Sequence, residues 1–261
     1  NQGTNAVAIG SEAGQNTQGI NCVAMGCLAG QIVQGSGAIA VGVNAGQTNQ
    51  GVNAVAIGVS AGQTNQGLNA VAVGNSAGGT TQGNYGVAIG YRAGQNTQGP
   101  SAVAVGNSAG SLQQGNNSIA IGNSAGQYTQ GSAAIAIGFR AGETLQNFNS
   151  VAIGLLAGSG TQGAAAVAVG SGAASAFQAS GAVAIGINAG NNNQLNNSVA
   201  IGALAGQNTQ GGTAVAIGSQ AGQAIQGANA VAMGSQAGQT NQQSSAIAIG
   251  FQAGKGTQGT N

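Results

Sequence analysis

The sequence predicts an all-β fold, a parallel β-solenoid of sixteen coils. Three observations predict it. One 16-residue unit repeats without insertion or deletion, with copies beginning at residues 5, 21, 37 and so on to 245 of the 261 residues. Each unit alternates small and β-branched residues, as in Ala54-Val55-Ala56-Ile57, which is the period of a strand. Each unit also holds glycines at fixed spacing, which oppose a helix.

A chain with this repeat is expected to form one coil per unit, each pairing with the next at about 4.8 Å. The abundance of Asn and Gln is also typical of amyloid-like disordered tracts. A disordered tract tolerates insertions and deletions between repeats, however, and this repeat keeps its phase throughout. We treat residues 1–261 as a single repeat array. Because it opens and closes in mid-repeat and shows no capping unit, we expect it to be a segment of a longer chain or fibre.

We number the positions of the unit 1 to 16 from residue 5. Val or Ile fills position 3, Ile, Val or Met position 5, Ala positions 4 and 9, and Gly position 6. Position 10 is Gly except at Ala174, and position 14 is always Gln. In a solenoid each position stacks on itself, so these positions predict ladders of side chains. The predicted structural ladders include Val7, Ile9, Gly10, Ala13, Gln18, Val55, Ile57, Gly58, Ala61, Gln66, Ile121, Gly122, Gln130, Ile217, Gly218 and Gln226.

The first strand is expected at positions 2 to 5, with Gly at position 6 ending it in a tight corner. A second extended piece is expected through positions 9 to 14. We expect the Val and Ile ladders to form the core and the small residues of the same strand to point the other way. Because Ala at position 4 never varies, that second side is expected to lie against other chains. Two aliphatic side chains per coil bury little apolar surface, which also favours a homo-oligomer.

The invariant Gln at position 14 has two interpretations. It forms a structural stack of amides that bond their neighbours or a corner carbonyl. Alternatively, it forms a surface that binds a repeating ligand such as ice or a glycan. We favour the structural stack, because a corner or core position explains why every copy keeps this residue.

Composition argues against catalysis and against binding of a cofactor or metal. The chain has five charged residues and no His or Asp. Glu12 and Glu143, the acidic pair, are about eight coils apart, so no paired groups exist for acid–base work. Cys22 and Cys27 match no zinc or redox spacing and are interpreted as small residues replacing Ala and Ser. The chain is therefore expected not to be an enzyme.

Charge and hydropathy also argue against nucleic acid and membrane insertion. The net charge is +1, and Arg92, Arg140 and Lys255 are scattered rather than clustered. The two arginines share position 8 and are expected at the solvated surface. No apolar run approaches the roughly 18–20 residues of a membrane span.

The segments 117–122, 149–154 and 197–202, which read N-S-I/V-A-I-G, resemble the head repeats of trimeric autotransporter adhesins of the YadA type. Similar arrays look common in virion and phage fibres. The resemblance covers every repeat but only six of its positions, and the strict 16-residue period and the Ala-Gly-Gln-x-x-Gln-Gly motif depart from it. It implies a left-handed β-roll, a homotrimer about one axis and an extracellular, cell-surface or virion location. Flanking domains would then bind the surface receptor or glycan.

The leading functional hypothesis is a rigid structural fibre or adhesin segment. The first alternative is an ice-binding β-solenoid, since positions 12 and 13 often hold Thr or Asn. Apolar residues interrupt that array at Ile32, Val33, Leu112, Tyr128, Leu145, Phe177 and Ile225. The second alternative is a filament of solenoids stacked end to end, because neither end shows a polar cap.

Overall fold

The structure, a computed structural model, describes residues 2–259. It confirms the predicted fold: these residues are all β without a helix, and parallel strands 16 residues apart form a β-solenoid of about 16 turns. The chain divides into two halves, Asn1–Ala133 and Ala134–Asn261, which are described separately.

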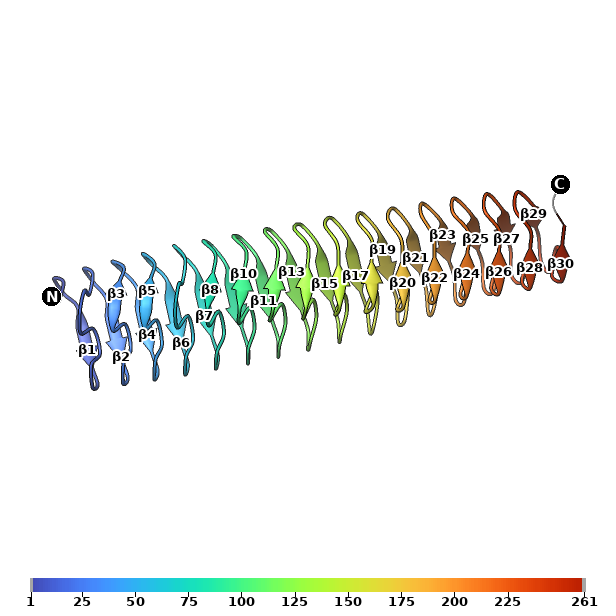
Figure 1. The fold of residues 1–261 in the computed structure, drawn as a ribbon. Helices are drawn as coiled ribbons and strands as arrows, with labels where there is room; N and C mark the ends of the chain where they lie inside the picture. The colour runs from blue at the N-terminus through green and yellow to red at the C-terminus, as the bar shows by residue number, and fades with distance from the viewer. Residues whose placement is uncertain (1, 260–261) are drawn as a thin grey trace. The chain divides into compact units, whose positions relative to one another are not determined.

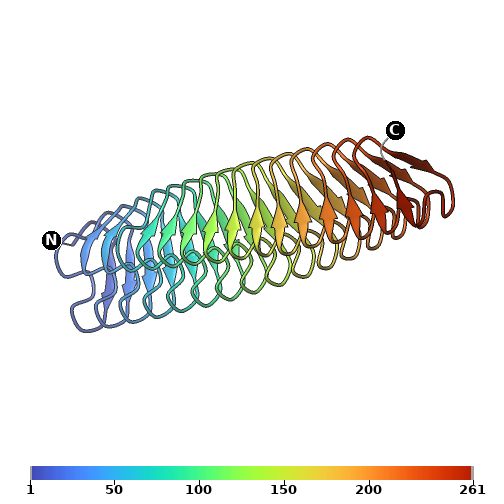
Figure 2. The same cartoon turned by 45° about the vertical axis from the view of Figure 1, so that its right-hand side comes forward.

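Each coil has two short strands and two turns. A strand at positions 3 to 5, the Val/Ile strand, is followed by a turn at positions 6 to 10, the first edge. A strand ending at position 14, the Gln strand, is followed by a turn through positions 15, 16, 1 and 2, the second edge. Figures 1 and 2 show these strands in two layers, with loops joining the layers along both edges. The space between the layers is the interior of each coil.

The first half contains eight Val/Ile strands and six Gln strands. Neighbouring Val/Ile strands pair in parallel with Val on Val or Ile, as in Val55 with Val71. The Gln strands form two separate groups, and Gln18 and Gln66 make isolated bridges. The Val/Ile strands are β1 (Val7–Ile9), β2 (Val23–Met25), β4 (Ile39–Val41), β6 (Val55–Ile57), β7 (Val71–Val73), β9 (Val87–Ile89), β11 (Val103–Val105) and β13 (Ile119–Ile121). The Gln strands are β3 (Ile32–Gln34), β5 (Thr48–Gln50), β8 (Thr81–Gln82), β10 (Thr97–Gln98), β12 (Gln113–Gln114) and β14 (Thr129–Gln130).

The second half repeats the arrangement with eight strands of each kind. The Val/Ile strands are β15 (Ile135–Ile137), β17 (Val151–Ile153), β19 (Val167–Val169), β21 (Val183–Ile185), β23 (Val199–Ile201), β25 (Val215–Ile217), β27 (Val231–Met233) and β29 (Ile247–Ile249). The Gln strands are β16 (Leu145–Gln146), β18 (Thr161–Gln162), β20 (Phe177–Gln178), β22 (Asn193–Gln194), β24 (Thr209–Gln210), β26 (Ile225–Gln226), β28 (Asn241–Gln242) and β30 (Thr257–Gln258). In both halves the pairing register is an unbroken step of 16 residues.

The second extended piece is shorter than the sequence predicts. We expected it over positions 9 to 14, whereas the strands cover positions 13 and 14, or 12 to 14 in β3 and β5. The reason is the backbone at position 10, which has a positive φ, as at Gly62 (φ 49°). A strand needs a negative φ, so positions 9 and 10 belong to the turn.

Both edges use the same kind of turn. At the first edge the Ala61 N–H donates to the Gly58 carbonyl (3.3 Å), and Ser60 has a φ of 54°. At the second edge the Ala54 N–H donates to the Gly51 carbonyl (3.2 Å), and Asn53 has a φ of 55°. A positive φ at the third residue is the pattern of a type II turn, which favours Gly or Asn there. The frequent Asn at position 1 follows from this geometry.

Glycine at position 6 is required for two reasons. Gly58 has a φ of +124°, and a Cβ added there would lie 2.7 Å from the carbonyl oxygen of Gly74 in the next coil. Backbone stacks on backbone at this corner, so neither the conformation nor the space admits a side chain.

The core differs from the prediction, which placed Val and Ile inside. Between Cys22 and Ala246 the small residues at positions 2, 4 and 9 are buried, and the alanines among them are 0% exposed. The Val and Ile side chains at positions 3 and 5, including Val55 and Ile57, are half-buried or exposed. Side chains alternate along a strand, so the strand has one Ala side and one Val/Ile side, and the Ala side faces inward. The invariant Ala at position 4 therefore marks a close contact within the chain, not one with other chains.

Candidate interaction surface

The interior of each coil is filled by alanines and by one Gln. Gln178 is 0% exposed and its side chain crosses from its own strand to the Val/Ile strand of the same coil. There its Nε2 donates to the Val167 carbonyl (2.8 Å). The same amide donates to Ala182 O (3.1 Å) and to Gln194 Oε1 (3.0 Å) in the next coil. The glutamine thus fastens the two layers to each other and each coil to the next.

The same bonds recur in the first half. Gln66 Nε2 donates to Val55 O (2.8 Å), to Ala70 O (3.4 Å) and to Gln82 Oε1 (3.2 Å). These contacts support the structural interpretation of position 14 and not the ligand-binding one, because the amide lies inside the coil. The interior is identified by a long polar side chain at one invariant position and alanines at others. This signal is present in the sequence, although Val and Ile were expected to form the core.

The ladder residues named from the sequence lie in three places. The outward side of the Val/Ile strands holds Val7, Ile9, Val55, Ile57, Ile121 and Ile217. The first edge holds Gly10, Ala13, Gly58, Ala61, Gly122 and Gly218, with Ala61 fully buried. The interior holds Gln18, Gln66, Gln130 and Gln226, each at most 3% exposed.

The outward side chains at positions 3 and 5 form one continuous apolar surface in each half, which we name the Val/Ile face. In the first half its position-5 members include Ile57, Ile89 and Ile121, which are 38–41% exposed. In the second half the exposed members include Ile153 and Ile185. No polar or charged residue interrupts either row.

The size of the face can be estimated from strand geometry. Eight coils about 4.8 Å apart, with a Val/Ile pair about 10 Å wide, give about 400 Å² of apolar area in each half. The largest apolar patch of a typical monomeric protein covers about 300–600 Å² and is often a functional surface. The Val/Ile face is therefore the candidate interaction surface of this chain.

The opposite face, on the outward side of the Gln strands, is mixed. Polar amide ladders cross parts of it, such as Gln47 Nε2 to Gln31 Oε1 and Gln63 Nε2 to Gln47 Oε1, both 3.1 Å. Next to that ladder, positions 12 and 13 expose large apolar side chains in several coils, namely Ile32, Val33, Leu112, Tyr128, Leu145, Phe177 and Ile225. This face has no uniform chemistry.

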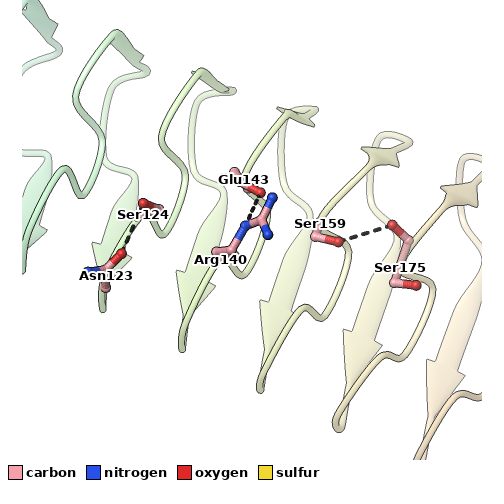
Figure 3. Close-up of polar contacts among 6 residues, drawn as sticks. All are labelled: Asn123, Ser124, Arg140, Glu143, Ser159 and Ser175. Carbon is pink, nitrogen blue, oxygen red and sulfur yellow. Dashed lines mark hydrogen bonds and ion pairs between the residues drawn. The ribbon is translucent and has the colours of Figure 1, made fainter.

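The charged residues make local contacts. Arg140 and Glu143 point toward one another in Figure 3, and Arg140 Nε donates to Glu143 Oε2 (2.7 Å). The Arg92 guanidinium carbon lies 5.0 Å from the centroid of the Tyr91 ring. Glu12 accepts a hydrogen bond from Gln31 Nε2 (2.7 Å). As expected, both arginines are at the surface.

Neither cysteine forms a disulfide: Cys22 is buried in the small-residue ladder at position 2, and Cys27 is exposed at position 7. Residues 2–259 enclose no pocket and bring together no group of three metal-ligating side chains. In the same range no helix is long and apolar enough to cross a membrane.

No protein-family model matches the chain, and a search of curated proteins finds no relative for it. Function has to be argued from the geometry of the two faces and the two edges.

Proposed function

We propose that this chain is a structural, non-enzymatic protein that associates with copies of itself through the Val/Ile face and forms a segment of a rigid fibre. The observation that supports the proposal most directly is the uninterrupted row of Val, Ile and Met side chains at positions 3 and 5, all of them half-buried or exposed. The sequence analysis expected self-association through the Ala side. The Val/Ile face is the opposite side of the same strand.

A second copy fits this face better than an unrelated partner. The face repeats with the coil, so a partner that covers it along its length needs apolar residues at the same spacing. A copy of this chain has that spacing by construction. Each half by itself offers about 400 Å², about half of the roughly 800 Å² per partner of a standard interface. With five charged residues in the chain, like-charge repulsion between copies is small.

The number of copies and the location come from the resemblance to adhesin head repeats. It implies three chains about one axis and a place on a cell surface or virion. Three Val/Ile faces turned toward a common axis would form one shared apolar core. Binding of a receptor or glycan would then belong to flanking domains.

The ice-binding alternative gains no support from the opposite face. Large apolar side chains such as Leu112, Tyr128 and Phe177 are exposed among its Thr and Asn residues. A lattice-matching surface needs a regular array, and this face has none.

Paired charge variants test the proposal. Ile89→Glu with Ile121→Glu places two carboxylates on the Val/Ile face, where a second copy would have to bury them. Thr81→Glu with Gln113→Glu places the same charge on the exposed outward side of β8 and β12. Sedimentation velocity should show the first variant as a monomer with a wild-type circular dichroism spectrum, and the second as the wild-type oligomer. If both variants sediment as the wild type does, association does not use the Val/Ile face.

A further inference from the structure

The two edges of the solenoid carry large exposed apolar residues at matching levels. In the first half, Tyr85 at the second edge and Tyr91 at the first edge belong to the same coil and are 56% and 45% exposed. They flank β9 on its two sides. Val52 lies at the second edge, at the junction of two consecutive coils. The first-edge residues of those two coils, Val43 and Val59, are exposed, as Val52 is.

The second half shows the same matching. Phe148 lies at the second edge, at the junction of two consecutive coils. The first-edge residues of those two coils are Phe139 and Leu155, and all three side chains are exposed. One level contains Leu195 at the second edge and Ile187 at the first. Two exposed edge residues have no such counterpart in the described part of the chain: Ile20 at the second edge of the first half, and Phe251 at the first edge of the second half.

Contact within one chain does not explain the matching. Tyr85 and Tyr91 lie on opposite edges of the coil with the extended strand β9 between them, and their Cα atoms are up to about 20 Å apart. The same holds for the other pairs, which lie on opposite edges of a coil. Each edge residue is instead exposed and available to another copy.

Symmetry supplies the explanation. Rotation about an axis parallel to the solenoid axis leaves every coil at its own level, so the first edge of one copy meets the second edge of the next at the same coil. A two-fold axis perpendicular to the solenoid axis would run the copies antiparallel and bring like edges together. Matching between unlike edges of one coil is expected only from the parallel arrangement.

We infer that copies of this chain assemble parallel and in register, with the first edge of each copy packed against the second edge of the next. Tyr85 of one copy then lies against Tyr91 and Arg92 of its neighbour. This inference rests on the proposed self-association and adds to it the direction, the register and the residues that fix them. Large residues meet large residues at the edges, and a shift by one coil would place Tyr85 opposite the small Asn75 or Asn107.

The chain's own tyrosines allow a test. It contains three, Tyr85, Tyr91 and Tyr128, and Tyr128 lies on the opposite face. Photo-oxidation with a ruthenium trisbipyridyl complex and persulfate removes one electron and one proton from each of two touching phenol rings. A carbon–carbon bond forms between the rings, and persulfate takes the electrons. Peptide mass spectrometry identifies which tyrosines are joined, and denaturing electrophoresis shows whether they come from different copies.

The inference predicts covalent oligomers joined through Tyr85 and Tyr91. Tyr91→Phe and Tyr85→Phe keep an aromatic ring at the edge but should each lose the covalent product. Tyr128→Phe, the matched control, should keep it. A Tyr91–Tyr91 or Tyr85–Tyr85 product, or no product from a protein that sediments as an oligomer, would overturn the register and leave self-association standing. A protein that sediments as a monomer would overturn both.

Discussion

The Gln side chain at position 14 fills the role that a large apolar residue has in an ordinary core. From Gln18 to Gln242 it is the largest buried side chain of its coil, and it is long enough to span the space between the two layers. An aliphatic residue of that size would fill the space but could not bond the carbonyls and amides that line it. Each copy from Gln18 to Gln258 donates a hydrogen bond to the Val/Ile strand of its own coil, which explains why no copy replaces this residue.

Replacing Gln178 by Leu should therefore destabilise the chain by about 2–3 kcal/mol, since several hydrogen bonds worth about 1 kcal/mol each are lost. The bonds in question are those to Val167, Ala182 and Gln194. Urea unfolding followed by circular dichroism measures the change. Phe177→Thr, on the exposed side of the same strand, is the control and should shift stability by no more than about 0.5 kcal/mol. Equal effects of the two substitutions would show that the amide stack is not structural.

The Val/Ile strand illustrates what sequence alone can and cannot predict. The repeat, a strand ending at position 5 and the Gly corner follow from period 2 and from glycine at a fixed spacing, and the structure confirms them, with the strand beginning at position 3 rather than at the predicted position 2. Which side of the strand faces inward does not follow, because a strand with Ala on one side and Val or Ile on the other can be turned either way. The deciding fact is that Gln and the three small residues at positions 2, 4 and 9 already fill the narrow interior.

The candidate interaction surface could be predicted only in part, because the sequence does not determine which side of the strand faces out. Self-association was expected, but on the Ala side. Positions 3 and 5 vary between Val, Ile and Met, whereas positions 4, 9 and 14 never vary. Positions that keep one residue in every copy line the interior, where the space is fixed. Positions that exchange one aliphatic residue for another lie on the outward side of the strand. The pairing of the edge residues across a coil becomes visible only once the two turns are placed.

Two adjacent substitutions in β13 should separate the two sides. Ala120→Val adds two methyl groups to a fully buried site and should cost about 1–3 kcal/mol through overpacking. Ile121→Val shortens an exposed side chain at a position where Val41 and Val73 occur naturally, and should cost less than about 1 kcal/mol. Thermal unfolding of the two variants checks the order. A larger loss at Ile121 than at Ala120 would mean that the Val/Ile side is the interior.

Because each coil bonds only to the coils before and after it, the molecule behaves as a one-dimensional stack. Stability then depends on the phase of the repeat more than on its length. The register step of 16 residues keeps glycine on glycine and glutamine on glutamine in both halves.

Deleting residues 197–212 removes one whole unit and should leave a folded protein with a strand content lower by one coil. Deleting residues 197–204 removes half a unit and would stack position 6 glycines on positions that carry side chains. This variant should unfold at the junction. Limited proteolysis with mapping of the cleavage sites distinguishes the two, and similar protection of both variants would contradict the repeat assignment.

Self-association through the Val/Ile face is a property of the whole molecule, and the mass of the unmodified protein in solution tests it most directly. Light scattering over a range of concentrations measures it. The account predicts a trimer of about 73 kDa, three times the 24.4 kDa of one chain. A stable monomer of 24.4 kDa at every concentration would leave the Val/Ile face in water and contradict the proposed function.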